Sequence, residues 1–171
     1  MDRVLADKVE VNRIEHERLL KDVNYKDVRF NPKNGALTAI HKEHNFDPTI
    51  GKFGIPRGNY EKISLDVLSK YGRKVVLCSE KTPHGQKSSE GLLDDISFDI
   101  KGVEGTAERN ITRKMYEASE KEADILVLYY HDKNLFNAQK ILDSYKSYLR
   151  NSKSKSLKKI YYIVNRKLYE I

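Results

Sequence analysis

The sequence predicts an α/β (α+β) fold in which a single mixed, largely antiparallel sheet carries packed helices. From about residue 59 onward, helical and extended segments follow the order α-β-β-β-α-β and then α-β-β. Apolar residues recur at helical spacing in the helical segments and alternate or run continuously in the extended ones. Turn residues separate the neighbouring strands, and helices on a sheet are the usual way to bury such faces.

Length and composition favour one globular domain. The chain has 171 residues, of which 39% are hydrophobic and 33% charged, and its net charge is +7. No apolar run approaches the ~20 residues that span a bilayer, and the charged N-terminus does not resemble a signal peptide. Cys78 is the single cysteine, which excludes an internal disulfide and a cysteine-rich zinc cluster. We therefore expect a cytoplasmic protein without a membrane span.

The first part of the chain is expected to precede the main domain. Residues 1–24 are highly charged and have weak helical spacing, which predicts a helical arm or linker before a domain at 25–171. Two short extended segments, at 28–32 and 36–41, are separated by a turn signal. A loop rich in glycine and proline follows.

The central elements have clear boundaries in the sequence. Asn59 is expected to cap a helix that runs to Tyr71, and a buried strand is expected at 74–80. Residues 91–102 alternate on either side of Asp94-Asp95, which predicts a β-hairpin with a two-residue turn.

The last elements complete the expected sheet. Thr106 is expected to cap a helix at 107–122, and the continuously apolar segment 124–130 predicts a central strand. Asp132 is expected to cap a helix that ends near Leu149. A terminal hairpin then turns around Asn165-Arg166.

The hairpin brings acidic residues and a lysine together. In a two-residue turn Glu90 falls opposite Asp99, and alternation places Lys101 on the same face. Two carboxylates this close repel each other unless a cation lies between them or one is protonated. Lys101 or a bound Mg²⁺ would relieve that cost, and Glu80 at the end of the preceding strand could join the group. An ordinary surface ion pair is the alternative interpretation.

This spacing resembles the PD-(D/E)XK nuclease signature, in which an acidic residue precedes a (D/E)-x-K strand. Asp99-Ile100-Lys101 supplies the D-x-K, whereas Glu90 stands where the signature usually has Asp. The resemblance covers roughly residues 59–130. It implies a catalytic group of Glu80, Glu90, Asp99 and Lys101, and it makes Glu90 and Asp99 the ligands if Mg²⁺ is used.

A broader resemblance covers about residues 36–171. These stretches are ALTAIHKEHNFDP, GNYEKISLDVL, SSEGLLDDISFDIKG, ERNITRKMYEASEKEADILVLYY and IYYIVNRKLYEI. They resemble the C-terminal nuclease domain of contact-dependent growth-inhibition (CDI) toxins and the end of some bacteriophage minor head proteins. The resemblance implies an RNase that typically cleaves tRNA, and an immunity or antitoxin protein as a possible partner. Some relatives are grouped with the metal-free barnase, colicin and RelE enzymes, so no cofactor is expected, with Mg²⁺ as the alternative.

A metal-free mechanism needs a base, and His41 is the candidate. His41 and His44 lie three residues apart, and histidine titrates near neutral pH. The Asn45-Phe46-Asp47-Pro48 stretch argues against a helix that would put both on one face, and a third nearby ligand is missing. We therefore do not expect zinc, and a loop histidine bonded to backbone is the competing interpretation.

Phosphate contacts are expected in two places. The first turn of the helix after the hairpin carries Thr106, Arg109 and Asn110, and Lys114 continues its polar side. The second place is the basic segment 146–159, which contains Lys153 and Lys155. Capping and a solvated face explain the same residues without a ligand.

The sequence thus supports three functions. The leading hypothesis is a nuclease domain that cleaves RNA, with tRNA as the expected substrate, and is toxin-like or encoded by a phage or mobile element. The second is a Mg²⁺-dependent DNase that uses the same acids. The third is a non-catalytic, phage-associated domain that binds nucleic acid or has a structural role.

Overall fold

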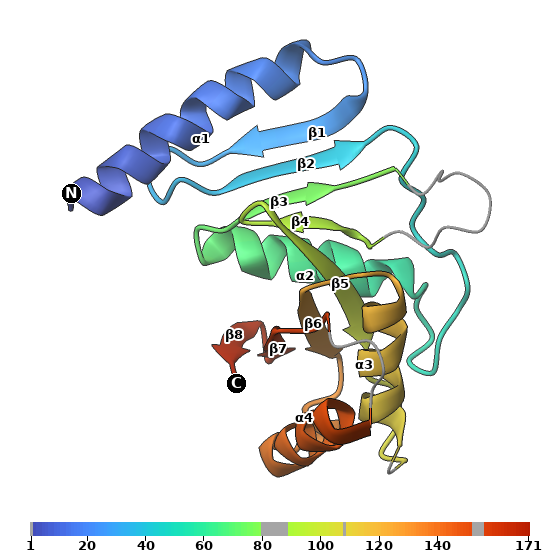
Figure 1. The fold of residues 1–171 in the computed structure, drawn as a ribbon. Helices are drawn as coiled ribbons and strands as arrows, with labels where there is room; N and C mark the ends of the chain where they lie inside the picture. Colours follow the sequence, from blue (N-terminus) through green and yellow to red (C-terminus); the bar gives the residue numbers. More distant parts are fainter. Residues whose placement is uncertain (1, 80–88, 108, 152–155) are drawn as a thin grey trace.

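One eight-stranded sheet organises the chain. The structure is a computed structural model of residues 1–171 that describes residues 2–79, 89–107, 109–151 and 156–171. The strands lie in the order in which they occur along the chain, from β1 to β8. Figure 1 shows the long helix α1 at one end of the molecule and α4 at the other, with the strands between them.

The elements have the following bounds. The helices are α1 (Arg3–Lys21), α2 (Gly58–Lys70), α3 (Asn110–Glu120), the 3₁₀ turn η1 (Lys133–Leu135) and α4 (Ala138–Asn151). The strands are β1 (Tyr25–Phe30), β2 (Leu37–His41), β3 (Lys74–Leu77), β4 (Gly91–Leu93), β5 (Ile96–Gly102), β6 (Ile125–Tyr130), β7 (Lys159–Val164) and β8 (Lys167–Glu170).

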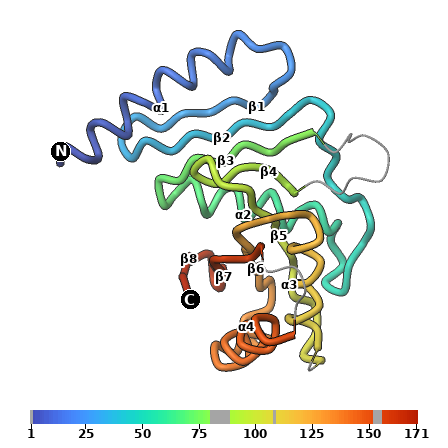
Figure 2. The backbone as a smooth tube through the Cα atoms, viewed as in Figure 1, coloured from blue at the N-terminus to red at the C-terminus, as the bar shows by residue number. Residues whose placement is uncertain are grey.

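The mixed sheet confirms the predicted fold class and element order. Four neighbouring pairs are antiparallel: β1–β2, β3–β4, β4–β5 and β7–β8. Three pairs are parallel: β2–β3, β5–β6 and β6–β7. A helix connects the two strands of each parallel pair, because a parallel pair needs a crossover whereas an antiparallel pair closes through a short turn. Figure 2 follows the chain through these crossovers to its C-terminus at β8.

Helices cover both faces of the sheet. The apolar side of α2 packs on one face with Phe98 and Ile100 of β5. The apolar sides of α3 and α4 pack on the other face with Leu126 and Leu128 of β6. Because side chains alternate along a strand, the face of β5 that carries Asp99 is turned toward α3.

The hairpin has the predicted register. Leu93 pairs with Ile96 and Gly91 pairs with Phe98. Asp94 and Asp95 have φ values of 49° and 69°, the left-handed conformation that a two-residue turn between twisted strands requires. The turn is fastened to the body because Arg73 donates to the Asp94 carboxylate at 2.5 Å.

Two predicted helix starts are wrong. α2 begins at Gly58 after Arg57, which is helical itself and provides no side-chain cap, so Asn59 lies inside the helix. α3 begins at Asn110 and not at residue 107, and Thr106 does not cap it. Asn110, the first residue of α3, contacts the preceding segment through its side chain, in which Nδ2 donates to the carbonyl of Gly105 at 3.2 Å.

Two further boundaries differ from the prediction. Asp132 caps the short turn η1 by accepting from the Asn134 backbone N–H at 2.9 Å, and α4 starts only at Ala138. β3 ends at Leu77, three residues before the predicted end of the strand, because the pairing with β4 stops at Gly91. Both differences arise from local hydrogen bonding that apolar spacing does not report.

The N-terminal segment forms α1, which packs on β1 and β2. Leu19 is buried with Leu37 and Ala39 of β2, and Asn12 donates to the Gly35 carbonyl at 2.7 Å. The division into an arm at 1–24 and a domain at 25–171 stays a prediction. Among the described residues, no helix is both long and apolar enough to cross a membrane.

Gly91 allows β4 to approach β3 closely, which generates a first prediction. A Cβ at this position would lie 2.0 Å from the Val76 carbonyl oxygen, a backbone atom that cannot rotate away. We expect Gly91→Ala to destabilise the protein by about 1–3 kcal/mol in denaturant unfolding, because the strands must separate. In Gly105→Ala, the control, the new Cβ would lie 3.5 Å from Asn110 Nδ2, an ordinary contact. Equal stability of the two variants would contradict the strand packing.

Candidate functional site

The candidate site is a cleft of about 650 Å³ between the loop that precedes α2, the outer half of β5 and the exposed side of α3. Its charged lining residues are Asp47, Arg57, Glu61, Glu90, Lys101, Glu104, Arg113, Lys114 and Glu117. Acidic and basic side chains are thus mixed among the residues that line it. A cleft with this composition can hold both a cation and the phosphates of a polyanion.

Asp99 and Lys101 come to the cleft on β5. The Asp99 side chain is fully buried, and its two oxygens lie 3.5 Å from Lys101 Nζ and 3.6 Å from Lys121 Nζ. These distances are those of ion pairs, and neither oxygen accepts a hydrogen bond from a residue that the structure describes. A buried carboxylate in this state is costly, so its environment favours a further cation.

Glu90 and Glu61 form an unfavourable acidic pair. Burial, followed by the charge and hydrogen bonding of Glu61 and the charge of Asp99, raises the pKa of Glu90 from 4.5 to about 9. Glu61 comes from the first turn of α2, and Glu90 lies one residue before β4. The Glu90 backbone is still held beside β3, because its carbonyl accepts from the Cys78 N–H at 2.9 Å, and its carboxyl lies next to those of Glu61 and Asp99. Without a cation, the site has to keep a proton on one of these groups at neutral pH.

The pKa values of two lysines in the cleft differ from the ordinary value. Burial would lower the pKa of Lys101, but the carboxylates of Asp99 and Glu117 outweigh it, and the pKa lies above its ordinary value. Glu117 on α3 lies 3.6 Å from Lys101 Nζ. Burial lowers the pKa of Lys114, which is two turns before Lys121 and lines the cleft. Lys101 is therefore a fixed positive charge at the wall of the cleft.

His44 lies beside the two glutamates. Its Nε2 is 2.9 Å from Glu61 Oε2, its Nδ1 is 3.0 Å from the Cys78 carbonyl oxygen, and its side chain is fully buried. One ligand atom from each of His44, Glu61 and Glu90 can be chosen so that all three lie within 4.8 Å of one another. These residues come from a loop, a helix and a strand end, so only the tertiary structure brings them together.

Glu104 holds the opposite wall in place. Its carboxylate accepts from the Lys52 backbone N–H at 2.8 Å, from Arg57 Nε at 2.9 Å and from the Tyr60 hydroxyl at 3.1 Å. Burial and the neighbouring carboxylate raise the pKa of Tyr60 to about 12, so the hydroxyl remains a donor. The loop before α2 is thus tied to the end of β5.

The structure brings some predicted site residues together and separates others. Glu90, Lys101 and Lys114 line the cleft, and Asp99 is buried behind Lys101. His41 does not line it: its Nδ1 accepts from the Glu43 backbone N–H at 3.1 Å, and its ring contacts Tyr25. The roles of all these residues stay predictions.

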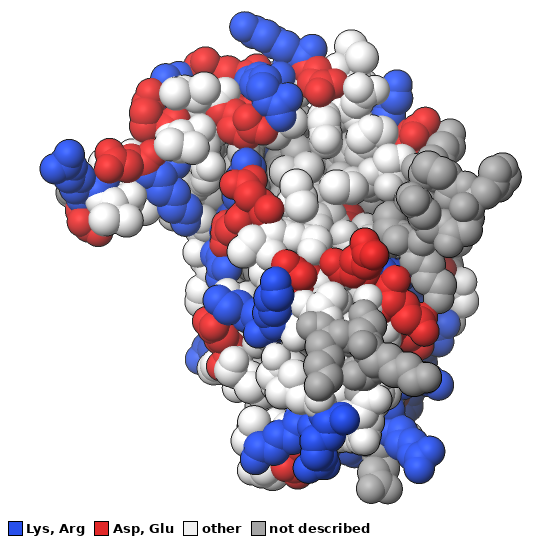
Figure 3. All heavy atoms as spheres, viewed as in Figure 1, with Lys and Arg blue, Asp and Glu red and all other residues white. Residues whose placement is uncertain are grey.

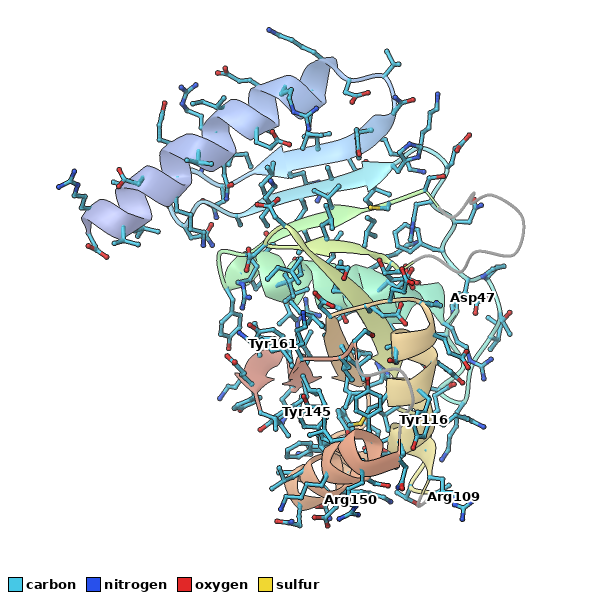
Figure 4. The ribbon with its side chains drawn as sticks, viewed as in Figure 1. Asp47, Arg109, Tyr116, Tyr145, Arg150 and Tyr161 are labelled. Carbon is cyan, nitrogen blue, oxygen red and sulfur yellow. The ribbon has the colours of Figure 1, made fainter. Side chains whose placement is uncertain are left out.

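The predicted phosphate contacts are scattered. Thr106 and Asn110 do not line the cleft, and the Thr106 carbonyl accepts from Lys140. Arg109 directly precedes α3 and borders two other pockets. Figure 4 shows it near α4. Asp47, in contrast, lines the cleft. Glu80, Lys153 and Lys155 lie outside the described residues.

Basic and acidic groups are unevenly distributed over the surface. On the face seen in Figure 3, Lys and Arg side chains gather at the lower end, over α4, and Asp and Glu side chains lie across the middle. Helix α4 carries Lys140, Lys146 and Arg150. A nucleic acid that entered the cleft could therefore continue over a basic surface next to α3.

Glu61, Glu104, Glu117 and Arg57 were not predicted as site residues, and His44 was considered only beside His41. Glu61 is placed at helical spacing from Leu65 and Leu68, so an acid occupies a position where the pattern favours an apolar residue. An acidic residue at a position expected to be apolar could therefore have indicated a site residue. Glu117 has the pattern of an ordinary solvated helix residue, and no local signal distinguishes the structural role of His44.

Comparison with known proteins supports the fold. Neither a family model nor a curated protein sequence matches the chain. The chain is similar to one chain of a solved structure described as "CdiA-CT/CdiI toxin and immunity complex from Burkholderia pseudomallei". The TM-score is 0.54 and the identity 18%, and the match covers 78% of this chain and 98% of that chain. At this identity the similarity shows a shared fold.

The acidic pair generates a prediction on pH. The pKa of Glu90 is about 9 in the folded protein and ordinarily 4.5, so the folded state binds the extra proton between these values. Stability should therefore fall as pH rises through this window. In EDTA, we expect Glu90→Gln to remove at least ~1 kcal/mol of this loss, about the value of one pKa unit.

Thermal unfolding between about pH 5 and about pH 9 measures the effect. Glu170→Gln is the matched control, because it removes an exposed carboxyl on β8 that pairs with Lys159 at 3.3 Å. Parallel stability profiles for Glu90→Gln and the wild type would show that the pair is not strained.

Proposed function

We propose that this chain is a nuclease that cleaves RNA phosphodiester bonds in the cleft. The observation that carries the proposal is the convergence of Glu61, Glu90 and Asp99 beside Lys101 at the wall of that cleft. Three acids and a lysine at one place are the groups that phosphodiester hydrolysis needs. The shared fold with a chain of a toxin and immunity complex supports a toxin-like role.

A divalent cation suits the acids of this site. Neither oxygen of buried Asp99 accepts a hydrogen bond from the described residues, and Glu90 and Glu61 need a proton or a cation between them. Hard divalent ions prefer carboxylate oxygens, so Glu90 and Glu61 would hold the ion beside the buried Asp99. A bound ion would polarise a phosphoryl oxygen and lower the pKa of a water molecule.

The other residues would act on the substrate directly. Lys101 Nζ, fixed between Asp99 and Glu117, would stabilise negative charge that develops on the scissile phosphate. Lys114 and Arg113 on α3 also line the cleft and would hold the neighbouring phosphates. Arg57 on the opposite wall, ordered by Glu104, would orient the strand.

The metal-free alternative has less support from the geometry. It requires a base near the ribose 2′-hydroxyl, and His41 does not line the cleft. His44 is buried, with both ring nitrogens engaged by Cys78 and Glu61. The acids therefore favour the cation-dependent mechanism, which the DNase hypothesis shares.

The substrate and partner are further parts of the proposal. RNA, and tRNA in particular, is the substrate that the sequence resemblance to CDI toxin nuclease domains implies. A toxin of this kind requires a neutralising partner in the cell that makes it, and the structural neighbour is a complex of a toxin with an immunity protein. We propose such an immunity partner for this chain as well.

A cleavage assay tests the proposal. Purified protein is incubated with total tRNA and with plasmid DNA, each with Mg²⁺, with Mn²⁺ and with EDTA. We expect tRNA cleavage with a divalent ion and none in EDTA. Cleavage in EDTA that leaves 2′,3′-cyclic phosphates would support the metal-free mechanism, and cleavage of plasmid alone would support the DNase. Binding without cleavage would leave the non-catalytic role.

A lysine pair tests the role of Lys101. We expect Lys101→Met to slow cleavage by about 100-fold or more, because it removes a fixed charge at the transition state. Lys158→Met is the control, since Lys158 also pairs with a carboxylate, that of the half-buried Asp124 at 3.7 Å, but does not line the cleft. Similar cleavage rates for the two variants would remove Lys101 from the mechanism.

A further inference from the structure

The ring of His44 is held in one orientation. It lies in the loop between β2 and α2, 2% exposed, with Phe46 edge-on at 5.1 Å between ring centroids. Its Nδ1 is 3.0 Å from the carbonyl oxygen of Cys78. A carbonyl oxygen can only accept, so Nδ1 carries the hydrogen and Nε2 is the atom directed at the glutamates.

The three side chains have the spacing of one coordination sphere. Ligand atoms about 2.1 Å from an ion are about 3.0 Å apart at a right angle and about 4.2 Å apart on opposite sides. His44 Nε2 and Glu61 Oε2 are 2.9 Å apart, and a set with Glu90 lies within 4.8 Å. Without an ion, a proton has to lie between His44 Nε2 and the Glu61 carboxylate, and a metal ion could take its place.

Two observations beyond this spacing point to a ligand. A histidine that binds a metal through one ring nitrogen usually donates the other N–H to a carbonyl or carboxylate, and the His44–Cys78 contact has this form. The fully buried Asp99 carboxylate, which acts on Glu90 electrostatically, accepts no hydrogen bond from the described residues. A metal ion beside Glu90 would bind to His44 and would add positive charge near Asp99, besides that of Lys101 and Lys121.

We propose that His44 Nε2, Glu61 and Glu90 form a mixed nitrogen and oxygen site that selects a first-row transition-metal ion over Mg²⁺. Imidazole favours transition metals, whereas Mg²⁺ prefers oxygen ligands alone. The site adjoins the cleft through Glu61 and Glu90, which leaves ligand positions for water or a phosphate. The inference rests on the proposed function only in making this ion the one used for cleavage.

Mn²⁺ is the probe for the test, because it is paramagnetic and can be compared directly with Mg²⁺. Electron spin echo spectra of the wild-type protein with Mn²⁺ should contain the modulation of a directly bound ¹⁴N nucleus. Labelling the histidines with ¹⁵N should replace that modulation without altering the protein. This measurement does not depend on the folding of a variant.

Substitutions then identify the histidine that supplies the bound nitrogen. We expect His44→Gln to weaken Mn²⁺ binding by about 10- to 100-fold in calorimetry, at least the loss found when a residue that orients a metal ligand is replaced. We expect Mg²⁺ binding to change much less. His16→Gln is the matched control, because His16 stacks on Phe30 away from the cleft. Thermal unfolding establishes that each variant is folded.

The outcomes separate the inference from the proposed function. Bound Mn²⁺ without histidine modulation, or equal loss of Mn²⁺ and Mg²⁺ binding in His44→Gln, would overturn the inference while RNA cleavage still stood. Absence of Mn²⁺ binding would overturn it as well. Histidine modulation in a protein that cleaves neither RNA nor DNA would support the metal site and contradict the nuclease.

Discussion

The electrostatic cost of burying Asp99 is the constraint on which the site depends. Its carboxylate lies inside the sheet with two lysine ammonium groups at ion-pair distance and no hydrogen bond from the described residues. Glu90 and Glu61 add two more acids nearby, and burial, followed by the interactions with Glu61 and Asp99, raises the pKa of Glu90 to about 9. A protein retains such an arrangement where it is compensated by a ligand or a proton, because an apolar core would be more stable.

The fold creates this arrangement through β5, which packs one face into the core with α2 and turns the other face toward α3. Phe98 and Ile100 secure the strand against α2, so Asp99 and Lys101 are directed toward α3. The strand continues past the end of β4, which opens the sheet where Glu90 lies. Gly102 allows the Tyr60 ring to lie close to the end of β5, since a Cβ there would be 2.2 Å from that ring. The cleft is therefore a consequence of unequal strand lengths.

The walls of the cleft have different tasks. The α2 side contributes acids and a buried histidine, which suit a cation, and the α3 side contributes Lys114 and Arg113, which suit phosphates. Glu104 prevents the loop before α2 from separating from β5, because it accepts hydrogen bonds from that loop and from Tyr60. A substrate phosphate between the walls would meet Lys101, whose charge is maintained by Asp99 and Glu117.

The sequence by itself determined the element order, the mixed sheet and the hairpin register, because alternation and the Asp94-Asp95 turn are local signals. It also placed Glu90, Asp99 and Lys101 near one another, since the position of the turn fixes which residues of the two strands are opposite each other. The starts of α3 and α4 were misplaced, because hydrogen bonds between side chains and the backbone stabilise other local structure before each helix. Only the tertiary structure joined Glu61 and His44 to the acids and left His41 outside the cleft, because packing of α2 and its loop on the sheet decides which distant side chains meet.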